Sequence, residues 1–286
     1  MFKTKKRIIV LCIVAILVIA SVVWIAWGNT ALELNTTRVT NSTLPSAFNG
    51  FRIAQISDLH NTTIGNDNET LLTLLEQADP DIIVITGDMI DSRNTKVDVA
   101  LKFAEHATAI APCYYVSGNH ESRVTEYGAL KEGLKARGVT VLENAKTTLT
   151  VSGESITLIG VDDPTLCSDA SLAAKTEQFM MNDTLNKLVN EQDGFTVLLS
   201  HRPELFDTYV THGVDLVFSG HAHGGQFRLP FVGGVIAPHQ GLFPKYDAGL
   251  YTEQHTTMIV SRGIGNSILP FRVNNRPELV LVELAC

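Results

Sequence analysis

The sequence predicts an α/β fold. Five short apolar runs are each followed by glycine and polar residues, a pattern typical of buried strands that end in loops. Amphipathic segments with helical spacing alternate with these runs, which indicates βαβ units and parallel strands. The chain has 286 residues, 45% of them hydrophobic, so it is long enough to bury one large core.

The N-terminal segment comes first along the chain. Residues 1–7 contain four Lys or Arg residues, and residues 8–27 carry no charge. Twenty residues in a helix span about 30 Å, the thickness of the hydrocarbon core of a bilayer. We therefore expect a basic cytoplasmic tail over 1–7 and a transmembrane anchor over 8–27, with Trp24 and Trp27 near the outer interface.

Positive charge before the span predicts a single-pass protein of the cell membrane whose domain lies on the extracytoplasmic side. Two other interpretations exist. The first is a cleaved signal peptide, but such peptides usually have a shorter apolar run, and the region after this run lacks an A-x-A cleavage site. The second is a buried core helix, but such a helix would show an amphipathic pattern, which this segment does not. We expect residues 28–50 to form a polar linker that leads into a single domain over 51–286.

The elements of the domain follow in order. Strands are expected over 53–56, 82–85, 114–116, 197–199 and 216–218. Helices are expected over 68–78, 97–109, 127–137 and 172–189. Alternating segments over 140–142, 147–151 and 155–161 indicate an antiparallel portion, and late strands are expected over 258–261 and 279–283.

Potential metal ligands follow each of the five apolar runs. They are Asp58 with His60, Asp88 with Asp91, Asn119 with His120, His201, and His221 with His223. Ligands at the carboxyl ends of neighbouring strands converge at one edge of a sheet, where α/β folds bind ligands. Each motif alone also fits an ordinary turn, a helix cap or half of a structural zinc site. Their joint occurrence in this order favours a functional site.

Carboxylates, an amide and imidazoles suit two transition-metal ions such as Mn, Fe or Zn. Two cations roughly 3.5–4 Å apart can clamp the charge that develops in phosphoester hydrolysis and can deprotonate a bridging water. One carboxylate must then be shared. Asp88 is the natural bridge, because it stands alone between two other groups of ligands.

These motifs resemble the calcineurin-like metallophosphoesterase superfamily from about Phe51 to Leu284. Further motifs look like those of a bacterial membrane-associated branch, and they are Gly220-His221-Ala222-His223-Gly224-Gly225-Gln226, Arg262-Gly263-Ile264-Gly265 and Pro270-Phe271-Arg272. The resemblance implies a four-layer α/β/β/α sandwich of two mixed sheets with helices outside. It also implies a metal site at the carboxyl ends of the strands.

The resemblance further assigns roles to single residues. One metal would be held by Asp58, His60, Asp88 and His223, and the other by Asp88, Asn119, His201 and His221. His120 would be the general acid that protonates the leaving alkoxide, and Asp91 would orient ligands.

Charge and composition bound the partners. The net charge is −8, and without the four basic residues of the tail it is −12, because 18 basic residues then face 30 acidic ones. An acidic body argues against a nonspecific nucleic-acid-binding surface. We expect a monomer that takes a phosphoester substrate. Four scattered cysteines give neither a disulfide framework nor metal-type spacing.

Two groups outside the motifs are candidates for substrate contacts. Arg93, Arg202 and Arg272 could clamp a phosphate, or could form ordinary ion pairs. Aromatic residues among glycine and proline could form an apolar wall beside the metals, or a small separate core, and they are Phe227, Phe231, Phe243 and Phe271.

Three functions remain open at this point. The first is a membrane-anchored hydrolase of phosphodiesters or phosphomonoesters, which the full ligand set favours. The second is a pyrophosphohydrolase or phosphatase of a lipid-linked or cell-wall-linked substrate. The third is a metal-binding scaffold without catalysis, which would be expected to have lost ligands or the general acid.

Overall fold

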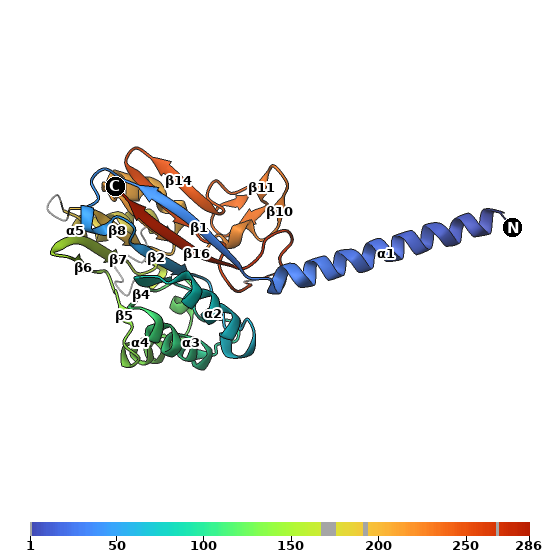
Figure 1. Ribbon diagram of the computed structural model, residues 1–286, viewed down its shortest axis with the longest axis horizontal. Helices are drawn as coiled ribbons and strands as arrows, with labels where there is room; N and C mark the ends of the chain where they lie inside the picture. The colour runs from blue at the N-terminus through green and yellow to red at the C-terminus, as the bar shows by residue number, and fades with distance from the viewer. Residues whose placement is uncertain (1, 167–175, 191–193, 267–268) are drawn as a thin grey trace.

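The structure is a computed structural model that describes residues 2–166, 176–190, 194–266 and 269–286. Two six-stranded mixed sheets pack face to face, and helices cover their outer faces (Figure 1). The expectation of a four-layer α/β/β/α sandwich is confirmed.

The first sheet has the strand order β1-β16-β2-β3-β4-β5. Its strands are β1 (Glu33–Thr40), β2 (Arg52–Ile56), β3 (Ile82–Thr86), β4 (Cys113–Val116), β5 (Thr140–Val141) and β16 (Glu278–Ala285). Strands β2 to β5 are parallel, while β16 is antiparallel to β2. The outer face is covered by α2 (Glu69–Ala78), α3 (Val97–Ile110) and α4 (Tyr127–Ala136).

The second sheet has the order β14-β15-β9-β8-β7-β6. Its strands are β6 (Ala145–Val151), β7 (Glu154–Gly160), β8 (Thr196–Leu199), β9 (Leu216–Ser219), β14 (Gly249–Glu253) and β15 (Thr256–Val260). The four central strands are parallel and the two edge strands are antiparallel to their neighbours. Its outer face carries α5 (Glu177–Leu188) and α6 (Phe206–Thr211). The predicted helix over 172–189 begins outside the described residues.

Successive side chains along a strand point to opposite faces of the sheet, and apolar side chains are buried on both faces. In β2, Ala54 and Ile56 pack under the helices, whereas Ile53 packs between the two sheets with Val197 and Phe218. Since both faces are buried, the strands read as continuous apolar runs, and this explains why they were visible in the sequence.

We had expected residues 28–50 to form a linker that leads into the domain, but the structure shows that part of this segment belongs to the first sheet. Its residues Glu33–Thr40 form the edge strand β1, which pairs in parallel with β16 from Glu33 opposite Glu278 to Thr40 opposite Ala285. The strand is half exposed and rich in Thr and Asn, so no apolar run marks it. Its stability comes from pairing with a strand more than 200 positions away.

Helix α1 (Phe2–Thr30) projects from the body as a single long rod (Figure 1). Within it, Lys5–Thr30 is long and apolar enough to cross a membrane, and none of its most apolar stretch is buried against the domain. Two small hairpins follow β9, and the one formed by β10 and β11 lies beside the base of α1 (Figure 1). They are formed by β10 (Arg228–Leu229), β11 (Gly233–Gly234), β12 (Ile236–Ala237) and β13 (Gly241–Leu242).

Candidate metal centre

Five parallel strands deliver the predicted ligands to one place. Strands β2, β3 and β4 end just before Asp58, Asp88 and Asn119, and strands β8 and β9 end just before His201 and His221. Their carboxyl ends face the same edge of the sandwich, so residues from both sheets meet there. The predicted ligands in these loops are buried, with at most 5% exposure.

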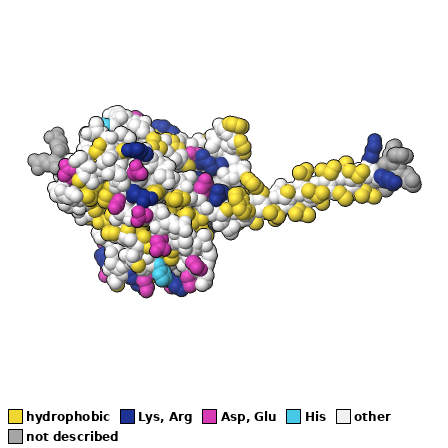
Figure 2. All heavy atoms as spheres, viewed as in Figure 1, with side chains coloured by type: hydrophobic (Ala, Val, Ile, Leu, Met, Phe, Trp, Pro, Cys, Tyr) yellow, Lys and Arg dark blue, Asp and Glu magenta, His cyan; other side chains and the backbone are white. Residues whose placement is uncertain are grey.

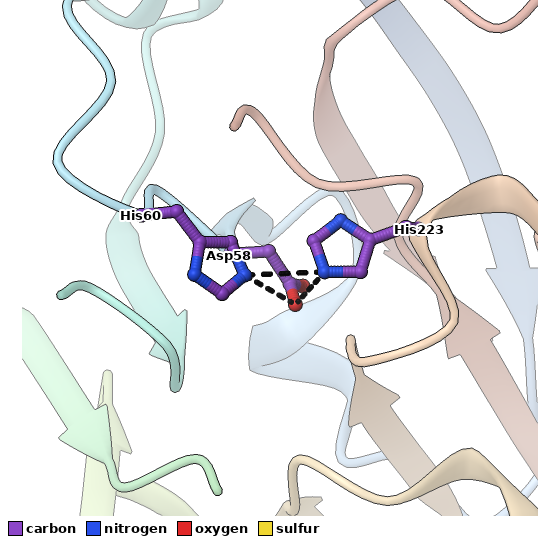
Figure 3. A group of neighbouring side chains, drawn as sticks. All are labelled: Asp58, His60 and His223. Atoms are coloured by element: carbon purple, nitrogen blue, oxygen red, sulfur yellow. Dashed lines mark hydrogen bonds and ion pairs between the residues drawn. The ribbon is translucent and has the colours of Figure 1, made fainter. Parts of the chain in front are cut away.

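A first ligand group consists of Asp58, His60 and His223, whose side chains point at one another (Figure 3). The Nε2 atoms of His60 and His223 are 3.1 Å apart. Asp58 Oδ1 lies 3.3 Å from His223 Nε2 and 3.8 Å from His60 Nε2. Three donor atoms therefore surround one small space.

A second ligand group consists of Asp88, His201 and His221. Asp88 Oδ2 lies 3.2 Å from His201 Nε2, and that nitrogen lies 3.2 Å from His221 Nδ1. The same Oδ2 is 3.6 Å from His60 Nε2 of the first group. Asp88 Oδ1 instead accepts the backbone N–H of His120 at 2.8 Å. One oxygen of Asp88 thus faces both groups while the other is held in place.

Two buried atoms test whether metals fit this site. Asn119 Oδ1 and His60 Nδ1 are buried and find no hydrogen-bond partner among the described residues. A buried acceptor without a partner is costly and calls for a specific explanation, such as an ion. Asn119 is the amide ligand that the sequence predicted, so its unpaired oxygen fits a metal there. The His60 Nδ1 atom has no such explanation.

Neighbouring backbone fixes the ligands in position. His201 Nδ1–H donates to the carbonyl oxygen of Thr86 at 2.6 Å, so Nε2 is the nitrogen that faces Asp88 and that would bind a metal after losing its proton. Glu121 accepts the backbone N–H groups of Asp88, Met89 and Gly118 at 2.8–2.9 Å. Glu121 directly follows His120 in the sequence, but nothing there indicates this role.

Five of the predicted ligands have a strained, left-handed backbone. Positive φ angles between 45° and 65° occur at Asp58, His60, Asp88, His221 and His223. Each left-handed residue other than glycine costs on the order of 1–3 kcal/mol, and such strain persists where the surroundings impose it, as at functional sites. Gly118 lies so close to Asp88 that a Cβ atom there would overlap Asp88 Oδ1.

Charge in the site is arranged to receive cations. Burial by itself would raise the pKa of the Asp88 carboxyl, but His201 and His60 outweigh burial and hold that pKa well below its usual range. For His201, Asp88 outweighs burial and raises the imidazole pKa to about 10. Burial lowers the pKa of His223 to about 3. Burial would also raise the pKa of the Asp58 carboxyl, but His223 and His60 outweigh burial and lower that pKa. Both buried carboxylates therefore stay ionised and require positive charge beside them.

Comparison with known proteins now identifies the family. The family model for calcineurin-like phosphoesterases matches residues 51–225. The chain belongs to this family. It is therefore a metal-dependent phosphoric ester hydrolase, and the two Asp/His groups can hold the metals of the dinuclear centre on which the family depends.

Individual relatives agree with this assignment. The chain is 31% identical to the uncharacterised metallophosphoesterase YkuE of Bacillus subtilis (strain 168), over 88% of this chain and 85% of the relative. It is 29% identical to the phosphodiesterase YaeI of Escherichia coli (strain K12), over 82% of both chains. The solved structure of TT1561 from Thermus thermophilus shares the fold with a TM-score of 0.50, at 15% identity, and covers 75% of this chain and 90% of that one.

The predicted general acid of this phosphoesterase, His120, lies beside the first ligand group, with its ring 4.5 Å from that of His60. Its Nδ1 accepts the backbone N–H of Ser92 at 3.0 Å, so the proton of the neutral ring is on Nε2. Asp91 Oδ1 lies 3.7 Å from Nδ1 and is held by Arg93. Burial lowers the pKa of His120 to about 4.

The three candidate arginines are all engaged by protein groups. Arg93 pairs with Asp91, and the buried Arg202 pairs with Asp163 through two nitrogens. Arg272 is only 1% exposed, and its guanidinium donates to the carbonyl oxygens of Arg262 and Gly265. Its remaining contacts are Asn266 Oδ1 at 3.1 Å and His223 Nδ1 at 3.5 Å. These contacts are those of a group that holds neighbouring residues, rather than those of an open phosphate clamp.

One further histidine belongs to the site. His239, at the tip between β12 and β13, places Nδ1 2.9 Å from His221 Nε2 and 3.0 Å from Arg202 Nη1. Since Arg202 must donate, His239 Nδ1 is an acceptor and His221 Nε2 donates to it. His221 therefore keeps its Nδ1 lone pair for a metal. Nothing in the sequence around His239 indicates that it reaches this site.

Proposed function

We propose that this protein is a membrane-anchored, dinuclear-metal phosphoesterase that hydrolyses phosphodiester or phosphomonoester bonds on the extracytoplasmic side. The observation that carries the proposal is the position of Asp88 Oδ2, within 3.6 Å of nitrogen ligands from both groups. A single shared carboxylate oxygen is what a pair of closely spaced cations requires.

The ligands divide into two sets in this proposal. Asp58, His60, Asp88 and His223 would hold one ion, and Asp88, Asn119, His201 and His221 would hold the other. Mn, Fe and Zn all suit this mixture of imidazole and oxygen donors. Bound ions would supply Lewis-acid stabilisation of the phosphoryl oxygens and would lower the pKa of water.

His120 supplies the proton in this proposal. His120 would give the Nε2 proton of its imidazolium form to the leaving alkoxide and would return to the neutral ring, whose Nδ1 accepts the Ser92 N–H. Asp91 contributes through its negative charge near Nδ1, which favours the ring when it carries a proton, and it does not touch the reacting atoms. Arg272 acts as a positioning residue for His223 rather than as a contact to phosphate.

In this proposal, the anchor helix places the domain at the outer surface of the membrane. Helix α1 carries basic residues at its N-terminal end and none in its last turn, which supports a domain outside the cytoplasm. Asn29, near the end of α1, bonds both the backbone N–H and the carbonyl of Arg272, and the Arg272 side chain reaches His223. This short chain of contacts from anchor to ligand favours a second candidate, a phosphatase or pyrophosphohydrolase of a lipid-linked or wall-linked substrate.

Full-length protein in lipid nanodiscs tests the proposal directly. After reconstitution with Mn²⁺, Fe²⁺ or Zn²⁺, it should hydrolyse aryl phosphodiesters or phosphomonoesters and should lose activity when chelator removes the ions. Comparison of aryl esters, nucleotides and lipid-linked phosphates at equal concentration would define the substrate class. Protein that binds two ions and hydrolyses none of these substrates would instead be a scaffold.

A further inference from the structure

The exposed hydrophobic residues of the body are unevenly distributed. Among the described residues beyond α1, large apolar side chains with high exposure lie within 229–243 or at Phe271, apart from Phe179 and Leu250. We call residues 227–243 together with Phe271 the apolar lobe. Its exposed members are Leu229, Phe231, Val232, Ile236, Leu242, Phe243 and Phe271. No Asp, Glu, Lys or Arg occurs from Leu229 to Pro244.

The exposed aromatic side chains of the lobe do not pack into the core of the domain. Phe231 is fully exposed at 108%, and Phe243 is 61% exposed. Both have positive φ angles, 67° and 54°, where a bulky side chain is disfavoured and glycine or asparagine would fit without strain. An aromatic residue that is exposed in water and also strained calls for a function outside the packed core.

Hydrogen bonds hold the lobe against the anchor. The Asn274 side chain accepts from Trp24 Nε1 at 3.0 Å and donates to the carbonyl oxygen of Arg228 at 3.3 Å. Arg228 begins β10, so the hairpin β10–β11 is two hydrogen bonds from the anchor helix. Within the lobe the rings of Phe227 and Phe271 lie 5.5 Å apart, which joins Phe271 to the hairpins.

The base of α1 is fixed as well. Arg276 donates to the carbonyl oxygens of Ala31 and Leu32 at 2.7 and 2.9 Å, and its guanidinium lies 5.0 Å from the ring centre of Trp27. Together with Asn29 on Arg272, these contacts set the angle between anchor and domain. In Figure 2, apolar side chains cover α1 and continue onto the edge of the body from which it emerges.

We propose that the apolar lobe docks on the same bilayer that α1 spans, with Phe231 at the tip of β10–β11 inserted into the interface. Trp24 lies about 9 Å along the helix from Thr30, which is the depth expected of an interfacial tryptophan when the domain rests on the membrane. The lobe beside it, which has no Asp, Glu, Lys or Arg from Leu229 to Phe243, continues the apolar surface of the anchor. A bilayer is therefore the occupant that the lobe fits.

Docking has a consequence for the site, and this consequence rests on the proposed function. His239 belongs to the lobe and contacts His221, while Phe271 adjoins Arg272, which contacts His223. The metal centre would thus lie beside the docked surface. A phosphoester carried by a lipid could then reach it with its apolar part still in the bilayer.

Tryptophan fluorescence tests the docking. The full chain with Phe231→Trp is reconstituted into phosphatidylcholine vesicles whose acyl chains are brominated near the headgroup, and Phe179→Trp serves as the matched control. Phe179 is similarly apolar and 45% exposed, but it lies on α5, far from α1 (Figure 1). We expect the emission that Phe231→Trp adds to be blue-shifted and quenched by bromine, and the emission that Phe179→Trp adds to be neither.

The alternatives give different signals. If the tryptophan introduced by Phe231→Trp emits without a shift and without quenching, the lobe faces water. A blue shift without quenching would show that protein covers the lobe, and either result overturns the docking. If Trp24 and Trp27 also escape quenching, the anchor itself is not in the bilayer. Unchanged hydrolysis of a soluble aryl phosphodiester by Phe231→Trp shows that the fold is intact, so failure of docking is distinguishable from failure of the phosphoesterase function.

Discussion

Replacing Asp88 with Asn tests the shared carboxylate most directly. The amide keeps the shape of the side chain and can still accept the backbone N–H of His120, but it removes the negative charge. Asp88 Oδ2 lies 3.2 Å from His201 Nε2 and 3.6 Å from His60 Nε2, so any ion bound between these atoms is within about 4 Å of the carboxylate.

The size of the effect follows from that distance. Two unit charges about 4 Å apart interact by about 4 kcal/mol at an effective dielectric constant near 20. Since about 1.4 kcal/mol corresponds to a factor of ten and a divalent ion doubles the interaction with a unit charge, each metal site should weaken by at least roughly 10³-fold. We expect well under two ions per chain after dialysis, together with negligible hydrolysis.

Metal analysis by mass spectrometry and turnover of an aryl phosphodiester are the two measurements. Asp162→Asn is a suitable control, because Asp162 is a largely buried carboxyl that accepts from Ser117 Oγ at 2.7 Å and lies outside both ligand groups. It should retain two ions and most of its activity. Full metal occupancy and near-normal turnover in Asp88→Asn would refute the assignment of two ions bridged by this residue.

Three further predictions concern the proton donor, the ligand support and the topology. His120→Gln should keep both ions but hydrolyse esters with poor leaving groups about 10²–10⁴-fold more slowly, with a smaller loss for activated aryl esters; equal losses for both would argue against a general acid. His239→Ala should weaken metal binding about 10–100-fold in a chelator titration, because His221 loses its acceptor, whereas the loop variant His212→Ala should not. Finally, the exposed thiol of Cys286 should react with an impermeant maleimide in intact cells, and protection there would reverse the topology.

Much of the fold could be predicted from the sequence, and so could the residues that meet in the candidate metal centre, because those signals are local. A strand such as β3 (Ile82–Thr86) is buried on both faces, so it appears as an unbroken apolar run directly before Asp88. Conversely, β1 was missed since its residues are polar and half exposed, and its pairing with β16 depends on distant positions. The short hairpins of the apolar lobe were missed for a similar reason, since strands of two residues leave no periodic pattern.

The supporting contacts of the site were beyond sequence reasoning. Nothing near Arg272 in the sequence shows that its guanidinium turns toward backbone carbonyls and His223 instead of toward solvent. The role of Glu121 as an acceptor of three backbone N–H groups around Asp88 depends on how two loops from different strands approach each other. Residue type and spacing predict which groups can bind a metal, whereas the tertiary fold decides what holds those groups in place.

The anchor illustrates this difference most clearly. By composition α1 is only an apolar helix, and its sequence would equally fit a simple tether that makes no contact with the domain. In the structure, Asn29 of that helix holds both polar groups of the Arg272 backbone, and the Arg272 side chain contacts His223, a predicted metal ligand. Strand β1 follows after only two residues, so the helix passes almost directly into the first sheet. Helix α1 is thus continuous with the frame that positions His223. In the proposed arrangement, the same few contacts set both the orientation of the domain on the bilayer and the position of His223.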